Sequence, residues 1–218
     1  MNSRGAFRAF IFDMDGVIVD SNPLHRVAWE EYNRRHGIVT TEEMHQRMYG
    51  KRNDQIVRDF FGDELPPAEI FAHGAAKEAL YREMLRPGLE KALVPGIGAF
   101  LERHRGVPTA LATNAEPPNV AFILSESGLR HYFQATVDGH QVENPKPHPE
   151  VYLRAADLLG ISPEFCLVFE DSMTGVQAAQ AAGMRVVGLS TTHHELPGVA
   201  LLIRNFSDPA LEEWLNAQ

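Results

Sequence analysis

Two aspartates stand two residues apart directly after a short apolar segment near the start of the chain. Residues 9–12 are all apolar, and Asp13, Asp15 and Gly16 follow them. Such a run is typical of a strand buried on both faces of a parallel sheet, and these sheets bind ligands where their strands end. Two carboxylates this close repel each other unless a divalent cation or a shared proton compensates. An acidic turn is the alternative, because Asp and Gly are ordinary turn residues.

A second acidic pair follows another apolar segment. Glu170 and Asp171 come directly after residues 166–169, which are apolar throughout. Because the carboxyl ends of parallel strands meet at one edge of a sheet, we expect this pair to lie beside Asp13 and Asp15. Several carboxylates in one pocket require a hard cation, and Mg2+ with oxygen ligands fits that need. The sequence therefore predicts a Mg2+ site formed from these residues.

Three further side chains suit the binding of a phosphoryl group. Thr113 and Asn114 end a short apolar segment, and Lys146 stands between two prolines that restrict the backbone there. A hydroxyl, an amide and an ammonium group in one pocket can bind and neutralise phosphoryl oxygens. Asp13 would then attack phosphorus as a nucleophile, and Asp15 would act as the acid and the base. The combination predicts phosphoryl transfer through an aspartyl-phosphate.

The elements that must position these residues follow from an alternation of apolar segments and helical patterns. From residue 88 onward, short strand candidates alternate with helices, which indicates a parallel sheet with right-handed crossovers. Residues 23–87 carry only helical patterns and interrupt the first crossover. We predict an α/β fold with a doubly wound, Rossmann-like core over residues 1–22 and 88–218 and an inserted all-helical cap that selects the substrate. The strand candidates cover residues 9–12, 109–113, 133–137, 166–169, 185–189 and 200–203.

Four motifs resemble those of the haloacid dehalogenase superfamily of phosphotransferases, and within it the β-phosphoglucomutase-like branch. Asp13-x-Asp15-Gly16-Val17 is similar to the first motif of the family, and Thr113-Asn114 is similar to the second. Lys146-Pro147 is similar to the third motif, and Glu170-Asp171-Ser172-x-x-Gly175 is similar to the fourth. The resemblance covers essentially the whole chain, including the helices inserted after the first strand. Four concordant motifs are far more specific than any one of them.

The resemblance implies a role for each of these residues. Asp13 would be the nucleophile and Asp15 the acid and base, while the threonine of the second motif and the lysine of the third would bind phosphate. Mg2+ would be held by Asp13, the main-chain carbonyl of Asp15 and Asp171, with Glu170 close by. The dehalogenases of the superfamily lack the second aspartate of the first motif. Its presence here implies that the substrates are phosphate esters.

The resemblance extends to four candidate substrate residues in the cap. His25 is similar to a histidine at the start of the cap in the mutases, and Lys77 is similar to a cap lysine that meets the sugar. The mutases also hold the second phosphate with an arginine just after the cap glycine, whereas Lys51 and Arg52 stand one or two places earlier here. Each candidate has an ordinary alternative: a surface histidine, a solvated lysine on a helix, or a basic loop.

Composition narrows the possible partners and location. The chain has 218 residues, 44% of them hydrophobic, and a formal net charge of −9. This charge disfavours nucleic acid and anionic membranes, because both need a basic face. No stretch approaches the ~20 apolar residues of a membrane span, and the apolar stretch near the N-terminus is too short for a signal peptide. The single cysteine, Cys166, lies in an apolar segment, which indicates a buried, unreactive thiol. We expect a cytoplasmic monomer that binds a small phosphorylated metabolite, with an oligomer left open.

Three functions compete on these grounds. The leading one is a Mg2+-dependent phosphatase, with a sugar phosphate as the expected substrate. A β-phosphoglucomutase-type phosphomutase would share every core residue, and would differ in whether water or a second sugar hydroxyl takes the phosphoryl group from Asp13. A phospho-receiver signalling module also combines clustered acids, a threonine and a lysine on a doubly wound sheet. The helical insertion and Asp15 argue against it, because a receiver needs no lid and must retain its phosphoryl group.

Overall fold

The computed structural model describes residues 7–48 and 51–218, and the chain divides into two compact units. The first, which we call the core, comprises Met1–Asp20 and Leu93–Gln218. The second, which we call the cap, comprises Ser21–Ala92. The core is interrupted after its first strand, so both of its parts must come together before its sheet is complete.

The cap unit is longer than the range 23–87 expected from the sequence. Its last turns are a 3-10 turn over Arg86–Gly88 and the short helix α5 over Leu89–Ala92. The Pro87-Gly88 pair, which we expected to end the cap, lies within these helical turns. Proline is compatible with the first turn of a helix, because the amide hydrogen that it lacks has no partner there.

The core is built on a six-stranded sheet in the order β3-β2-β1-β4-β5-β6, and every neighbouring pair is parallel. The predicted doubly wound α/β fold is therefore confirmed. All four residues of β1 are buried, as a strand between two neighbours at the centre of such a sheet requires. The strands are β1 (Ala9–Phe12), β2 (Thr109–Ala112), β3 (Ala135–Val137), β4 (Cys166–Glu170), β5 (Arg185–Leu189) and β6 (Leu201–Ile203).

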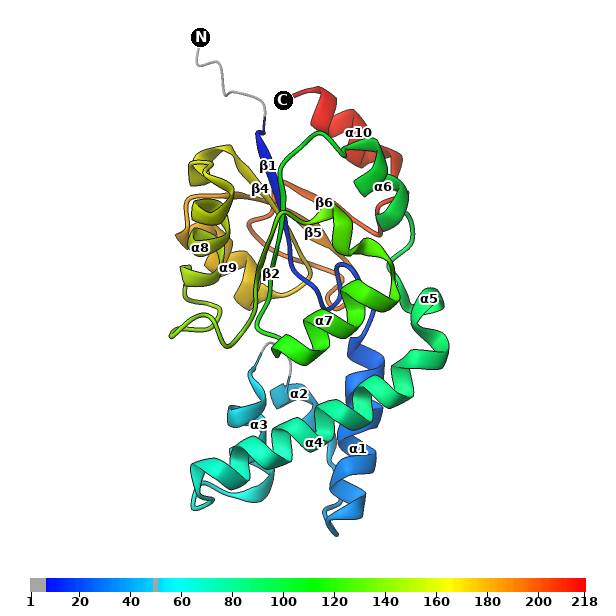
Figure 1. The fold of residues 1–218 in the computed structure, drawn as a ribbon, viewed down its shortest axis with the longest axis vertical. Coiled ribbons are helices and arrows are strands. Elements are labelled where there is room, and N and C mark those ends of the chain that lie inside the picture. The colour runs from blue at the N-terminus through cyan, green and yellow to red at the C-terminus, as the bar shows by residue number, and fades with distance from the viewer. Residues whose placement is uncertain (1–6, 49–50) are drawn as a thin grey trace. The chain divides into compact units, whose positions relative to one another are not determined.

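Helices cover both faces of the sheet, with α8 and α9 on one side and α6 and α10 on the other (Figure 1). Phe12 pairs with Leu111 of β2 and with Phe169 of β4. This register brings the residues that follow β1, β2 and β4 to the same edge of the sheet. The core helices are α6 (Ile97–Arg103), α7 (Pro117–Glu126), α8 (Glu150–Leu159), α9 (Met173–Ala181) and α10 (Pro209–Asn216), with 3-10 turns at Leu129–Tyr132 and Pro163–Phe165.

Aromatic side chains fill the core beneath the site. The rings of Phe12 and Phe169 stack with centroids 4.7 Å apart, and Phe100 and Phe206 pack against both. All four rings are buried. Tight packing of large side chains leaves β1 and β4 little freedom to move, which favours a rigid base for the residues at their ends.

The cap contains only helices among the residues that the structure describes. Helices α1 and α3 both pack on the long helix α4. The cap has a small hydrophobic core of its own, which contains Trp29, Tyr32, Ile56, Val57 and Ile70. The cap helices are α1 (Asn22–Arg35), α2 (Glu42–Met48), α3 (Asn53–Phe61) and α4 (Pro67–Leu85), before the 3-10 turn and α5.

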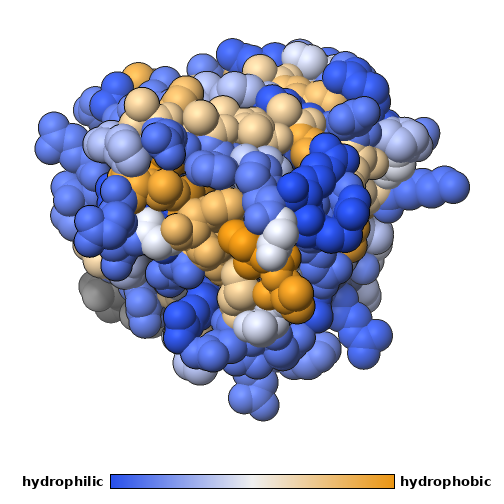
Figure 2. Space-filling model, turned by 90° about the horizontal axis from the view of Figure 1, so that it is seen from below, coloured by the Kyte–Doolittle hydropathy of each residue, from blue (hydrophilic) through white to orange (hydrophobic). Residues whose placement is uncertain are grey.

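The surface is mostly hydrophilic, with smaller hydrophobic patches between the polar residues on the face that Figure 2 shows. Large hydrophobic side chains that are exposed include Phe71 in the cap and Leu158 in the core. None of the helices over residues 7–48 and 51–218 has the length and apolar character that a membrane-spanning segment requires.

Candidate active site

Strand β1 carries Asp13 to the centre of the site. The backbone amide of Asp13 donates to the carbonyl of Phe169 at 3.0 Å, which continues the pairing of β1 with β4 by one residue. Gly16 then turns the chain with a φ of 75°, and its amide donates to the carbonyl of Val19 at 2.7 Å. Asp13 is buried and Asp15 is half-buried. The tight turn keeps both aspartates at the end of the strand.

Lys146 is the cation of the site. Its Nζ atom lies 2.9 Å from Oδ1 of Asp13 and 2.8 Å from Oε1 of Glu170, and donates to the carbonyl of Ala112 at 3.1 Å. Its backbone amide donates to Oδ1 of Asn114 at 3.2 Å. Lys146 thus contacts residues at the ends of β1, β2 and β4. Its buried ammonium group lies against Asp13, the candidate nucleophile.

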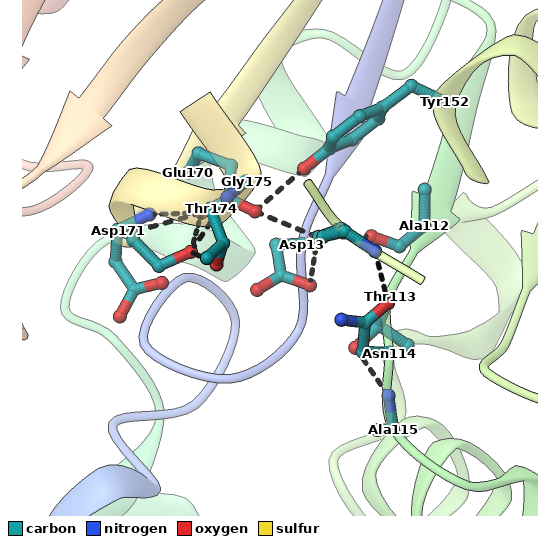
Figure 3. A network of polar contacts seen from close by, with 12 residues as sticks. Asp13, Ala112, Thr113, Asn114, Ala115, Tyr152, Glu170, Asp171, Thr174 and Gly175 are labelled. Carbon is teal, nitrogen blue, oxygen red and sulfur yellow. Dashed lines mark hydrogen bonds and ion pairs between the residues drawn. The ribbon is translucent and has the colours of Figure 1, made fainter. Parts of the chain in front are cut away.

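Glu170 is held by five hydrogen bonds. Its Oε1 atom accepts from Lys146 Nζ and from the hydroxyl of Tyr152, each at 2.8 Å. Its Oε2 atom accepts from the amides of Asp171 and Ser172 at 2.9 Å and from Ser172 Oγ at 3.0 Å. A Cβ atom on Gly175 would lie 1.6 Å from Oε1, so the glycine of the fourth motif leaves space for this carboxylate (Figure 3). The carboxylate therefore acts as an anchor for its neighbours.

The balance of burial and neighbouring charges raises the pKa values of Asp13, Asp171 and Lys146. Burial raises the pKa of Asp13 to about 7, although Lys146 opposes the shift. Burial and the charges of Glu170 and Asp13 raise the pKa of Asp171 well above its ordinary value. Burial alone would lower the pKa of Lys146, but Asp13 and Glu170 outweigh it and raise that pKa to about 12. The site therefore has more negative charge than one lysine can offset.

The acidic residues are arranged as a metal site would require. Carboxylate oxygens of Asp13, Glu170 and Asp171 all lie within 4.8 Å of one another. The raised pKa values of Asp13 and Asp171 show that a further positive charge would stabilise their ionised forms. Hard oxygen donors of this kind fit a divalent cation such as Mg2+. The sequence pattern predicted four acidic residues here, and the carboxylate of Asp15 is not part of this group of three among the described residues. Metal binding by the main-chain carbonyl of Asp15 stays a prediction.

Thr113 and Asn114 lie at the end of β2, as their place in the sequence predicts. Oγ1 of Thr113 accepts from the amide of Ala115 at 3.1 Å, which leaves its hydroxyl hydrogen available to a ligand. Asn114 is tied to Lys146 through Oδ1, so its amide nitrogen remains a donor. Thr113 is buried and Asn114 is half-buried. Both side chains can therefore donate to an anion at this edge (Figure 3).

Two of the cap candidates lie together within the cap. Lys77 is buried, and its Nζ atom donates to Nδ1 of His25 and to Oε1 of Glu78, each at 2.8 Å. Its ammonium group also lies 4.9 Å from the ring centroid of Trp29. The His25 ring stacks on Tyr81 with centroids 3.8 Å apart. The solvated-lysine alternative is thus wrong for Lys77, because a cation buried in this way needs these partners.

The other two cap candidates, which precede α3, pair with acidic residues of that helix. Lys51 Nζ lies 2.6 Å from Oδ2 of Asp59, and Arg52 Nε lies 3.7 Å from Oδ1 of Asp54. Both pairs are partly exposed, so each contributes little to stability. Both basic side chains therefore have an acidic partner in α3.

Four site residues were missed by the sequence analysis. Tyr152 lies outside the motifs, in helix α8, and no role was predicted for it. Ser172 lies within the fourth motif, but no role was predicted for its side chain. Thr191 donates to the carbonyl of Gly16 at 2.6 Å, and Thr192 donates to Oδ2 of Asp171. Neither threonine belongs to a motif, and hydroxyl residues after a strand are ordinary loop residues. The one available signal was their position after β5, because residues that follow parallel strands lie at the same edge of the sheet.

Comparison with known proteins gives a consistent result. A family model described as haloacid dehalogenase-like hydrolase matches residues 7–183. The fructose-1-phosphate phosphatase YqaB of Escherichia coli K12 is 35% identical over 183 residues, which cover 83% of this chain and 95% of that protein. The β-phosphoglucomutase of Bacillus subtilis 168 is 30% identical over 220 residues, which cover 95% of each chain.

A solved structure has the same fold. The crystal structure of a β-phosphoglucomutase from Clostridium difficile superposes with a TM-score of 0.85 over 97% of this chain and 98% of that chain, at 24% identity. The family model covers more than half of the chain and all four motifs. The chain therefore belongs to the haloacid dehalogenase-like hydrolases.

Proposed function

We propose that this hydrolase is a Mg2+-dependent phosphatase of a small phosphorylated carbohydrate and works through an aspartyl-phosphate. One observation carries the proposal: Asp13, at the end of the central strand, lies 2.9 Å from a buried lysine and beside two further buried carboxylates. A nucleophilic carboxylate, a fixed cation and a set of hard oxygen donors are what phosphoryl transfer through a covalent intermediate requires. Membership of a hydrolase family also favours an enzyme over a signalling module.

In the first step, a carboxylate oxygen of Asp13 attacks phosphorus and the bond between phosphorus and the ester oxygen breaks. Asp15 gives its proton to the departing sugar oxygen, which leaves as a hydroxyl group. In the second step, Asp15 takes a proton from a water molecule that attacks the same phosphorus. The bond to Asp13 breaks, and inorganic phosphate leaves. Asp15 ends each cycle protonated, as it began.

The neighbouring groups bind and neutralise the phosphoryl oxygens. Lys146 keeps its positive charge, since its pKa is raised to about 12, and its two carboxylate partners hold it in place. Thr113 and Asn114 supply a hydroxyl and an amide donor at the end of β2. Asp13 and Asp171, with Glu170 beside them, would hold Mg2+, which supplies positive charge for the phosphoryl oxygens as they become more negative.

A carbohydrate is the proposed alcohol part of the ester because of the relatives. The Escherichia coli relative is named as a fructose-1-phosphate phosphatase, and the Bacillus subtilis relative is named as a β-phosphoglucomutase. The cap would select the sugar, with His25 and Lys77 as its candidate contacts. Hydrolysis is favoured over mutase activity because Lys51 and Arg52 stand one or two places before the position at which the mutases have the arginine for a second phosphate.

The test is an assay of fructose 1-phosphate and β-glucose 1-phosphate with Mg2+, in which free phosphate and glucose 6-phosphate are measured in the same reaction. We expect phosphate to appear, to depend on Mg2+, and to stop when EDTA is added. Asp13→Asn prepared in parallel controls for a contaminating phosphatase. Glucose 6-phosphate without free phosphate would establish the mutase instead. No turnover of a wider panel of sugar phosphates would overturn the proposal.

A further inference from the structure

The loop after β5 reaches two other loops of the site through adjacent hydroxyl groups. Thr191 Oγ1 donates to the carbonyl of Gly16 at 2.6 Å, and Thr192 Oγ1 donates to Oδ2 of Asp171. Strand β5 pairs in parallel with β4, with Gly188 opposite Glu170, so the residues that follow both strands share one edge of the sheet. The two threonines therefore link the loops after β1, β4 and β5.

One oxygen of Asp171 is enclosed by the protein. A Cβ atom on Gly16 would lie 1.9 Å from Oδ2 of Asp171, so the backbone of the first motif packs directly against this oxygen. Thr192 donates its hydroxyl hydrogen to the same oxygen. Asp171 is only 2% exposed, which leaves it little freedom to rotate.

The geometry points to Thr192 as a positioning residue for the metal ligand Asp171. Its hydroxyl holds Oδ2 against the backbone of Gly16, which fixes the orientation of a carboxylate that lies beside those of Asp13 and Glu170. Thr191 donates to the backbone carbonyl of the same glycine, which follows Asp15 in the chain. Ligating carboxylates commonly depend on such outer partners, and their loss typically reduces metal affinity by 10–100-fold. This inference rests on the proposed function, because it assigns Asp171 to a Mg2+ site.

The test measures binding of Mg2+ alone, without substrate, by isothermal titration calorimetry of the wild type and three variants. Thr192→Val keeps the branched shape and removes the hydroxyl, while Thr192→Ser keeps the hydroxyl. Thr136→Val, on the half-buried face of β3, is the matched control. We expect Thr192→Val to raise the Mg2+ dissociation constant by roughly 10–100-fold. Thr192→Ser and the control should stay within about threefold of the wild type.

A second measurement separates positioning from loss of structure. Melting in EDTA should give a similar temperature for every variant, and Thr192→Ala replaces Thr192→Val if the latter does not fold. With saturating Mg2+, the kcat of Thr192→Val should recover most of the wild-type value. A folded Thr192→Val or Thr192→Ala with unchanged Mg2+ affinity would overturn the inference and leave the proposed phosphatase intact. A wild type that binds no Mg2+ would overturn both.

Discussion

The hydroxyl of Tyr152 donates to Oε1 of Glu170 at 2.8 Å, the same oxygen that Lys146 contacts at 2.8 Å. Lys146 also lies over the Tyr152 ring, 4.7 Å from its centroid. Tyr152 thus supports both partners of a buried ion pair, one through its hydroxyl and the other through its ring. Helix α8 therefore contributes to the candidate active site as well as to the hydrophobic core.

Tyr152→Phe should lower the free energy of unfolding. The variant keeps the ring and its contact with Lys146, but a buried carboxylate oxygen loses one of its two donors. Loss of a buried hydrogen bond to a charged group costs about 1.5–3 kcal/mol. Urea unfolding measures the change. Tyr132→Phe is the control, since its exposed hydroxyl donates to Glu102, and we expect a loss below about 0.5 kcal/mol. Equal stabilities of the two variants would contradict the anchoring of Glu170.

Asp13→Asn should abolish turnover without unfolding the protein. The amide is a poor nucleophile and cannot form the aspartyl-phosphate, so we expect kcat to fall by roughly 10³-fold or more. Phosphate release from the best sugar phosphate of the panel measures the loss. Asp20→Asn, an exposed carboxylate that follows the first-motif turn, is the control and should retain activity. Substantial activity in a clean Asp13→Asn preparation would rule out covalent catalysis by this residue.

The effect of Asp15→Asn on turnover should depend on the leaving group of the substrate. A sugar hydroxyl needs a proton as it departs, whereas p-nitrophenolate leaves without one. We expect no reaction with a sugar phosphate, but a burst of p-nitrophenol from p-nitrophenyl phosphate, because the phosphoenzyme forms and then persists. Stopped-flow absorbance measures the burst, with Asp13→Asn as the control that shows none. Steady turnover of both substrates at wild-type rates would exclude Asp15 as the acid and base.

The metal-free protein should become more stable as the pH falls from 8 to about 5. The pKa of Asp13 is raised to about 7 in the folded state from 3.8, so between these values the folded state binds more protons than the unfolded state. Its contribution to stability is therefore greatest at low pH and is lost as the pH rises through 7. Asp171 acts in the same direction, since its pKa is also raised.

Thermal melting in EDTA at several pH values tests this dependence. Other groups also titrate in the range, so the difference between the wild type and Asp13→Asn is the quantity to compare. At pH 8 the variant should be more stable by on the order of 1 kcal/mol, because it lacks a buried charge. The difference should shrink toward pH 5. A variant that is less stable than the wild type at pH 8 would show that the Lys146 ion pair outweighs burial.

The sequence by itself determined the fold class and the residues at the centre of the site. Strands β1, β2 and β4 are short apolar runs, and Asp13, Thr113 and Glu170 stand at or just after their ends. In a parallel sheet the topology alone carries such residues to one edge, so order along the chain was enough to predict their meeting. The boundary of the cap was less predictable, because Pro87 and Gly88 are compatible with helical turns as well as with a linker.

Tertiary structure decided which side chains hold these residues in place. Tyr152 and Glu170 are 18 residues apart, Asp171 and Thr192 are 21 apart, and His25 and Lys77 are 52 apart. Their meeting depends on how α8 packs on the sheet, on the path of the loop after β5, and on the packing of α1 on α4. Periodicity identifies which face of an element is buried, but not which partner a buried polar atom finds there. A buried polar atom needs a partner, because an unpaired polar group is costly in the interior. Tertiary packing decides which partner lies within reach.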